Sequence, residues 1–149
     1  MKIIFILLFT LSVFGQTESR MDSIKNEFIE DSFRYDVNMK PYLDVIQEIK
    51  IKKLNKHILG NYSNGVIQLN TSYLSGNRRL LKAVFYHEVG HLIGLEHLCE
   101  VCPFIMSAHN RIDFETITKK EWEYQLSVFY GMIQELNNKN KNKKTWQNY

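Results

Sequence analysis

The sequence predicts an α+β domain in which helices surround a small, twisted, mixed sheet, and three observations support that class. Apolar residues recur at helical spacing near both ends of the chain. Between residues 45 and 70 they alternate with polar residues, as in half-buried strands. A third helical pattern ends in the run His87–His97, which holds three histidines. The length of 149 residues leaves room for one domain.

The first 15 residues are typical of a secretory signal peptide. Lys2 gives a positive start, residues 3–14 form a largely apolar run, and the small residue Gly15 precedes a cut ahead of Gln16. The run is shorter than a membrane-spanning helix needs, so an uncleaved anchor is the weaker alternative. We expect a secreted or periplasmic protein with no stable membrane anchor after cleavage.

The helix expected between residues 17 and 36 carries one apolar stripe. Ile24, Phe28, Ile29 and Phe33 lie at spacings of four, one and four residues. Such a stripe usually packs against the rest of the domain, and here we expect it to cover a sheet.

Two strands are expected after this helix. Residues 45–54 alternate around Ile49 and Ile51 with lysines between them, as in a half-exposed strand. Residues 60–65 form a turn cluster that ends in Asn-Gly, and residues 66–70 form the next strand. Three or four short strands would complete the sheet.

The next helix is expected to begin at Ser75-Gly76-Asn77 and to lead into the histidines. Its buried side would consist of Leu80, Leu81, Val84 and Phe85, and Tyr86 would pack in the same core. Residues anchored on such a helix keep their geometry better than residues on a loop.

The last helix is expected to begin at a capping box formed by Thr118 and Glu121. Its apolar stripe ends near Asn137, so the folded domain would span residues 16–137. Residues 138–149 are rich in Asn and Lys without periodicity, which predicts a disordered basic tail. The net charge of +3 is too small to indicate a nucleic-acid partner, and we expect a monomer.

The histidine run has the spacing of a metal site. On a helix, His87 and His91 lie one turn apart on the same face, so both rings can reach one ion. Gly94 can adopt a positive φ and end the helix, after which His97 returns as a third ligand. A catalytic zinc keeps its fourth position for water, and Glu88 is placed to take a proton from that water.

The pattern H-E-x-x-H-x-x-G-x-x-H resembles that of the metzincin clan of zinc metallopeptidases, in which a methionine turn follows. The segment 103–107 looks like that turn, with Met106 as its methionine. The resemblance implies a small zincin-like fold with an active-site helix and a C-terminal helix. It also implies that Met106 forms a soft apolar floor beneath the imidazoles. Residues 66–70 would be the strand that pairs with an extended substrate.

The function implied by the resemblance is that of a zinc-dependent metalloendopeptidase with one catalytic Zn²⁺ and a protein or peptide substrate. His87, His91 and His97 would hold the ion, and Glu88 would act as general base. Alternatives are a zinc amidase acting on a non-protein amide such as a cell-wall peptide, a non-catalytic zinc-binding module, and a protein that merely folds around zinc.

The two cysteines of the chain, Cys99 and Cys102, follow the third histidine. In an exported protein such a pair most simply forms a disulfide, which would tie the loop that leads to the methionine turn. The alternatives are free thiols and a second zinc site, which His57 and His109 would have to complete.

Two further segments follow from the resemblance. The N-terminal segment could act as an inhibitory pro-segment, with Asp22 or Glu18 in the open zinc position. Residues 107–113 would form the wall of the specificity pocket. Some family members have a tyrosine donor two residues after the methionine, but Ala108 occupies that position here.

Overall fold

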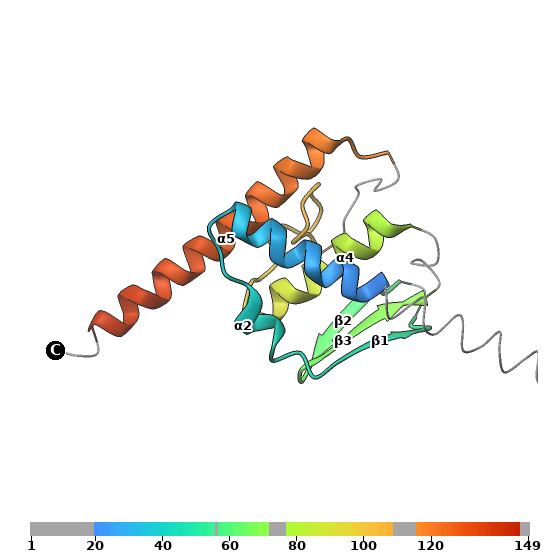
Figure 1. Cartoon of the computed structure of the whole chain (residues 1–149), viewed down its shortest axis with the longest axis horizontal. Helices are drawn as coiled ribbons and strands as arrows, with labels where there is room; N and C mark the ends of the chain where they lie inside the picture. The colour runs from blue at the N-terminus through green and yellow to red at the C-terminus, as the bar shows by residue number, and fades with distance from the viewer. Residues whose placement is uncertain (1–19, 56, 72–76, 109–115, 147–149) are drawn as a thin grey trace, which may run out of the picture.

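The computed structural model describes residues 20–55, 57–71, 77–108 and 116–146. After a helix over residues 20–34, the elements are α2 (Lys40–Leu43), β1 (Glu48–Lys52), β2 (Gly60–Ser63), β3 (Val66–Asn70), α4 (Arg78–Leu92) and α5 (Lys119–Trp146) (Figure 1). Helices and a small mixed sheet together form the α+β arrangement that was predicted. The signal peptide, Glu18, Ser75, Gly76, His109 and residues 110–113 lie outside the described residues.

The sheet has the strand order β1-β3-β2. β1 runs parallel to β3, and β2 runs antiparallel to β3, so the sheet is mixed as predicted. β3 is paired on both sides, and its backbone N–H and C=O groups are therefore already engaged in the ladder. The expectation that residues 66–70 pair with a substrate is wrong, because in the described sheet β3 lies between β1 and β2 and has no free edge.

The β2–β3 hairpin corrects the prediction of a turn over residues 60–65. Only Asn64 and Gly65 form the turn, with φ values of 50° and 80°, the conformation that two-residue hairpin loops favour. Residues 60–63 are therefore free to continue as a strand, in register with β3 from Gly60 opposite Leu69 to Ser63 opposite Val66.

β1 is shorter than the predicted strand over residues 45–54. Pro41 lies in the first turn of the short helix α2, which ends at Leu43, and Glu48–Lys52 then forms the strand. Its burial alternates along the five residues, with the lysines outward, as the sequence pattern predicts.

The helix over residues 20–34 is part of the core. Ile24 and Phe28 are fully buried, and the Phe28 ring meets the rings of Phe85 and Tyr86 edge-on, with centroids 5.8 and 4.5 Å apart. Phe33, at the far end of the predicted stripe, is 57% exposed, so the packed face is narrower than predicted.

The pro-segment hypothesis is wrong for Asp22. This residue lies on the core-packed helix, and its exposed carboxylate pairs with Lys25 at 3.6 Å rather than reaching the histidines. This helix contributes Ile24 and Phe28 to the core, so its removal would take two fully buried side chains from the domain.

Helix α4 packs against β2 and β3 on one side and against the N-terminal helix on the other (Figure 1). Its N-cap is Asn77, whose side chain accepts a hydrogen bond from the backbone N–H of Leu80 at 2.9 Å. At its other end Gly94 has a φ of 91°, which turns the chain out of the helix as predicted.

Helix α5 begins at the predicted capping box. The backbone N–H of Thr118 donates to Glu121 Oε2 at 2.8 Å, and the backbone N–H of Glu121 donates to Thr118 Oγ1 at 3.2 Å. The helix does not end near Asn137 but continues to Trp146, and its last turns project from the body of the domain (Figure 1).

This extension corrects the prediction of a disordered tail for residues 138–146, and residues 147–149 lie outside the described part of the chain. No proline or glycine follows Gly131 to end the helix, and lysine is a good helix former. The first turn of the extension is also supported by an ion pair between Lys139 and Glu135 at 2.8 Å.

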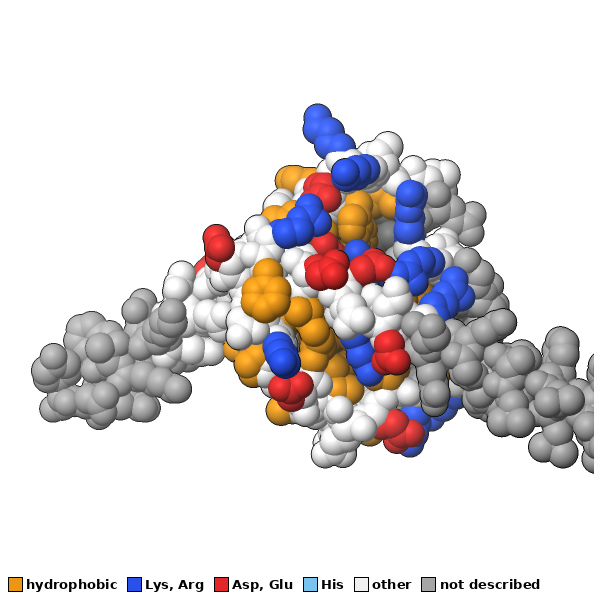
Figure 2. Space-filling view, in the orientation of Figure 1, with side chains coloured by type: hydrophobic (Ala, Val, Ile, Leu, Met, Phe, Trp, Pro, Cys, Tyr) orange, Lys and Arg blue, Asp and Glu red, His pale blue; other side chains and the backbone are white. Residues whose placement is uncertain are grey.

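The surface mixes charges of both signs. On the face shown in Figure 2, Lys and Arg side chains lie among Asp and Glu side chains, with hydrophobic groups exposed between them. None of the described helices is long and apolar enough to cross a membrane.

Candidate metal centre

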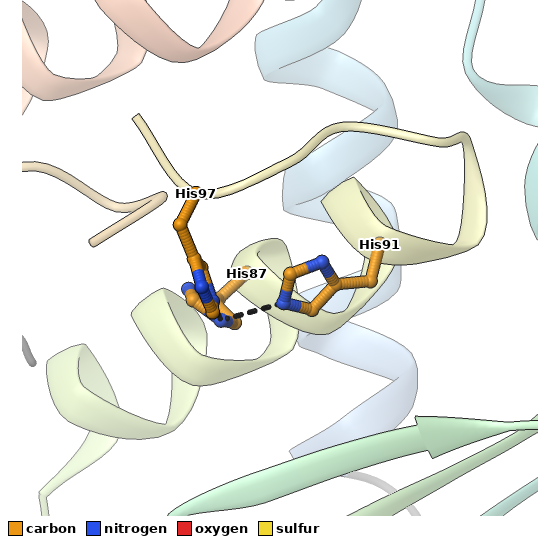
Figure 3. Close-up of side chains that lie close together, drawn as sticks. All are labelled: His87, His91 and His97. Carbon is orange, nitrogen blue, oxygen red and sulfur yellow. Dashed lines mark hydrogen bonds between the residues drawn. The ribbon is translucent and has the colours of Figure 1, made fainter. Parts of the chain in front are cut away.

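Three histidine side chains converge next to α4. His87 and His91 project from adjacent turns of the helix, and His97 reaches back from the segment beyond Gly94 (Figure 3). The Nε2 atom of His87 lies 3.0 Å from Nε2 of His91 and 3.3 Å from Nε2 of His97. One ligand atom from each ring lies within 4.8 Å of the others, which is close enough to bind a single metal ion.

The outer nitrogens of two rings are held by backbone carbonyls. His87 Nδ1 lies 2.6 Å from the carbonyl oxygen of Ile105, and His91 Nδ1 lies 3.1 Å from that of Leu95. A carbonyl only accepts, so each Nδ1 carries the proton and donates it. The Nε2 lone pairs are then left facing the centre of the cluster, which is the arrangement of metal-ligating histidines.

The spacing of the three nitrogens suits a small tetrahedral ion. Two nitrogens bound to zinc at about 2.0–2.1 Å in tetrahedral geometry lie about 3.3 Å apart. The observed Nε2 separations of 3.0 and 3.3 Å agree with that value. Burial, with the neighbouring His91 and His97 adding to it, lowers the pKa of His87 to about 4, against the opposing effect of the Ile105 carbonyl. The ring is therefore neutral, as a ligand must be.

Glu88 lies beside the histidines and is only 4% exposed. Burial raises the pKa of its carboxyl group to about 7, while a hydrogen bond from the backbone N–H of Tyr62 on β2 acts in the opposite direction. No cation pairs with this carboxylate among the residues that the structure describes. A buried carboxyl group with such a pKa can both accept and release a proton near neutral pH.

The histidines and Glu88 open into a cavity of about 460 Å³. Its lining comes from residues 57–62, of which residues 60–62 belong to β2, from α4 and from the segment after the histidines. The lining residues beyond the four already described are residues 57–62 and Leu80, Ala83, Val84, Ile105, Ser107 and Ala108. Of the predicted pocket wall, Ser107 and Ala108 line the cavity, and Ala108 brings no side-chain donor to it.

Met106 lies in the core behind α4. It is almost fully buried and packs against Gly90, where a side chain would collide with the Met106 sulfur and with Phe129. The backbone N–H of Leu98 donates to the Met106 carbonyl at 2.8 Å, which ties the segment after His97 to the predicted methionine turn. Gly90, on the helix between His87 and His91, is therefore required for this close approach.

Cys99 and Cys102 form a disulfide, with Cα atoms 6.0 Å apart. The alternatives of free thiols and of a second zinc site on these cysteines are therefore wrong, because neither sulfur is a thiolate. The backbone N–H of Ala108 donates to the Cys99 carbonyl at 3.1 Å, so the disulfide lies in a loop that closes on the segment after Met106.

Sequence analysis missed the groups that act through their backbone. The carbonyls of Ile105 and Leu95 orient two rings, and the N–H of Tyr62 reaches Glu88. Every residue carries these groups, so no sequence signal marks them. Gly60, whose Cα faces Glu88, was interpreted only as part of a turn.

Comparisons with protein-family models, with curated protein sequences and with solved structures find no match to this chain. The role of the site is therefore inferred from the arrangement of its side chains: a three-histidine cluster able to bind a metal ion, with a buried carboxyl group at its side.

Proposed function

We propose that the protein is a zinc-dependent metalloendopeptidase of the metzincin type, exported from the cytoplasm. The observation that carries the proposal is the convergence of three histidine Nε2 atoms at the edge of a cavity that Glu88 also lines. The motif explains why these residues converge, since a helix turn separates His87 from His91 and Gly94 returns the chain to His97.

His87, His91 and His97 would hold the ion through Nε2, with their orientation set in part by the Ile105 and Leu95 carbonyls. Zinc bound there would supply Lewis acidity for the scissile carbonyl and an acidified water molecule. Glu88 would take the proton of that water and later deliver it to the leaving amine. Its burial suits this double task, because it brings the pKa of the carboxyl group to about 7.

We infer that an extended peptide would bind along β2. β2 is an edge strand of the described sheet and also lines the cavity, so a substrate strand can pair with its backbone while its carbonyl reaches the histidine cluster. Much of the remaining lining is apolar, and it includes Leu80, Val84 and Ile105. These walls would accept an apolar side chain of the substrate.

The first test compares the chain that begins at Gln16 with its Glu88→Ala variant. Zinc content is measured on both proteins, and cleavage of a denatured generic protein is followed by product analysis. We expect equal zinc in both, cleavage by the parent, and a rate lower by about 10²–10⁴-fold in the variant, which is the usual contribution of a general base.

Two outcomes would contradict the proposal. If both proteins bind zinc and neither cuts any polypeptide while the parent hydrolyses cell-wall peptide amides, the protein is an amidase. If the parent shows no turnover on either substrate although it holds zinc, a non-catalytic zinc-binding module is the better description.

A further inference from the structure

Gly60, the first residue of β2, lies directly against Glu88. A Cβ atom placed on Gly60 would lie 2.7 Å from Glu88 Oε1, 3.0 Å from Glu88 Cγ and 2.7 Å from Val84 Cγ1. Real Cβ atoms do not approach other heavy atoms this closely. The backbone of Gly60 does not have a positive φ, in contrast to Gly65 and Gly94. Glycine is therefore required here by space and not by backbone conformation.

The strand is tied down at this point by Asn70. This fully buried side chain donates through Nδ2 to the carbonyls of Ile58 at 2.6 Å and Asn55 at 3.1 Å, and its Oδ1 accepts from the N–H of Leu54 at 3.3 Å. The backbone N–H of Asn70 also donates to the carbonyl of Leu59 at 2.9 Å, one residue before Gly60. Because these bonds hold the chain just ahead of β2, the strand cannot easily retreat from α4.

We propose that Gly60 is the residue that positions the Glu88 carboxylate for proton transfer. Without a side chain at residue 60, β2 closes over Glu88, and the carboxylate is confined between the strand, Val84 and the backbone N–H of Tyr62. This inference rests on the proposed peptidase function, since it assigns the geometry of that reaction's general base. Gly60 lines the cavity, but in this scheme its effect on the rate comes through the position of the Glu88 carboxylate.

An alanine at residue 60 must displace either the strand or the side chains that face it, the Glu88 carboxylate and Val84. Since Asn70 holds the strand, we expect the carboxylate to move, and a shift of about 1 Å in a catalytic group costs on the order of 10²-fold in rate. The rings of His87 and His91 are oriented by the Ile105 and Leu95 carbonyls, which lie outside β2, so we expect metal binding to be unchanged.

The experiment uses the chain from Gln16 loaded with zinc and compares Gly60→Ala with Gly131→Ala. Gly131 lies on α5, and a Cβ there would have nothing within 4 Å, which makes it a matched control. We expect Gly60→Ala to lower kcat by about 10–100-fold with KM and zinc content kept, and Gly131→Ala to behave as the parent. In crystal structures of the zinc-loaded proteins, the Glu88 carboxylate should be displaced only in Gly60→Ala.

A second pair of variants separates displacement of the carboxylate from general damage to the fold. Val84→Ala removes the Cγ1 atom that the new Cβ would meet, so Gly60→Ala/Val84→Ala keeps only the collision with Glu88. We expect the double variant to fold as Val84→Ala does and to have a kcat about 10–100-fold lower than Val84→Ala. If Gly60→Ala does not fold, this pair decides the matter.

The inference is overturned if kcat and the carboxylate position are unchanged in Gly60→Ala, or unchanged between the double variant and Val84→Ala. It is also overturned if zinc content falls in step with kcat, since Gly60 would then act on the metal site. If the parent cleaves no peptide, the proposed function fails, but the crystal structures still decide the positioning role. A displaced carboxylate supports that role, and an unmoved one contradicts it.

Discussion

The two sides of helix α4 bury polar groups in opposite ways. On the side that faces the N-terminal helix, Tyr86 Oη donates to Asp31 Oδ2 at 2.7 Å, and Lys82 Nζ lies 2.9 Å from the same oxygen. Lys82 also pairs with Glu27 at 3.1 Å, and Arg34 pairs with Asp31 at 2.9 Å. Each of these polar groups has a partner, as is usual for buried groups in stable structures.

On the side that faces the cavity, the polar groups converge on one another and do not form an ion-pair network among the described residues. Glu88 is buried without a cation among the described residues, and the Nε2 atoms of the histidines face one another. Folding gains little from such an arrangement, because a buried carboxylate and crowded lone pairs are costly without an ion or substrate. The difference between the two sides supports the proposal that one of them stabilises the helix, whereas the other would bind the metal ion and carry the reaction.

The largest effect is expected from a substitution on the side of α4 that faces the N-terminal helix. Replacing Phe28 by Ala removes the ring that packs on Phe85 and Tyr86, and should lower the free energy of unfolding by about 4 kcal/mol. Urea denaturation of the metal-free chain measures this. Phe33→Ala is the control on the same helix, since Phe33 is exposed and its loss should cost less than about 0.5 kcal/mol. Equal losses in both variants would show that the helix does not pack as described.

The ion-pair cluster on that side should give the next largest effect. Asp31→Ala leaves Lys82 and the Tyr86 hydroxyl without their shared buried partner, which should cost about 3 kcal/mol in the free energy of unfolding. Zinc stoichiometry in native buffer should not change. The control is Asp22→Ala, because Asp22 forms an exposed pair with Lys25, for which a loss below about 0.5 kcal/mol is expected. A loss of zinc in Asp31→Ala would mean that the two sides of α4 are not independent.

The next prediction concerns the cavity side of α4 and tests zinc binding through its effect on stability. With free zinc at about 100 times its dissociation constant, the free energy of unfolding should rise by about 2.7 kcal/mol. A chelator should abolish this increase. Thermal unfolding with and without the chelator measures this difference. His91→Ala should abolish the gain, whereas His57→Ala should keep it, because His57 lines the cavity but lies outside the three-histidine cluster. A gain that survives in His91→Ala would contradict the metal site.

The smallest effect concerns the turn that returns the chain to His97. Gly94 has a φ of 91°, so Gly94→Ala should lower the free energy of unfolding by about 1 kcal/mol although nothing lies within 4 Å of the added Cβ. Gly131→Ala, in an exposed helix interior, should instead raise it by about 0.5–1 kcal/mol. Chemical denaturation of both variants checks the signs, and a gain in Gly94→Ala would show that the turn has a different conformation.

Much of the candidate site was predictable because it is local. His87, His91, Gly94 and His97 lie within eleven residues, and the geometry of one helix and one turn determines how they meet. The capping box of Thr118 and Glu121 was predictable for the same reason. The convergence of the three histidines therefore follows from spacing along the chain.

Where the sequence-based prediction was wrong, either a segment distant in the chain or a missing stop signal explains the outcome. Gly60 lies in a segment with the composition of a turn, yet its pairing with Leu69 makes it the first residue of a strand. α5 has no apolar stripe after Asn137, yet it lacks a residue that would end it. Local pattern is a weak guide in such places, because pairing and the absence of a stop signal outweigh composition.

The α+β class, the histidine cluster and the helix that carries two of its rings were therefore predictable from the order of the residues alone. Only the tertiary structure decided that β2 closes over Glu88, that the Ile105 carbonyl orients His87, and that Asp31 meets Tyr86 across 55 residues of chain. The physical reason is that helical spacing sets distances within a turn. Distances between elements are set by how the whole core packs.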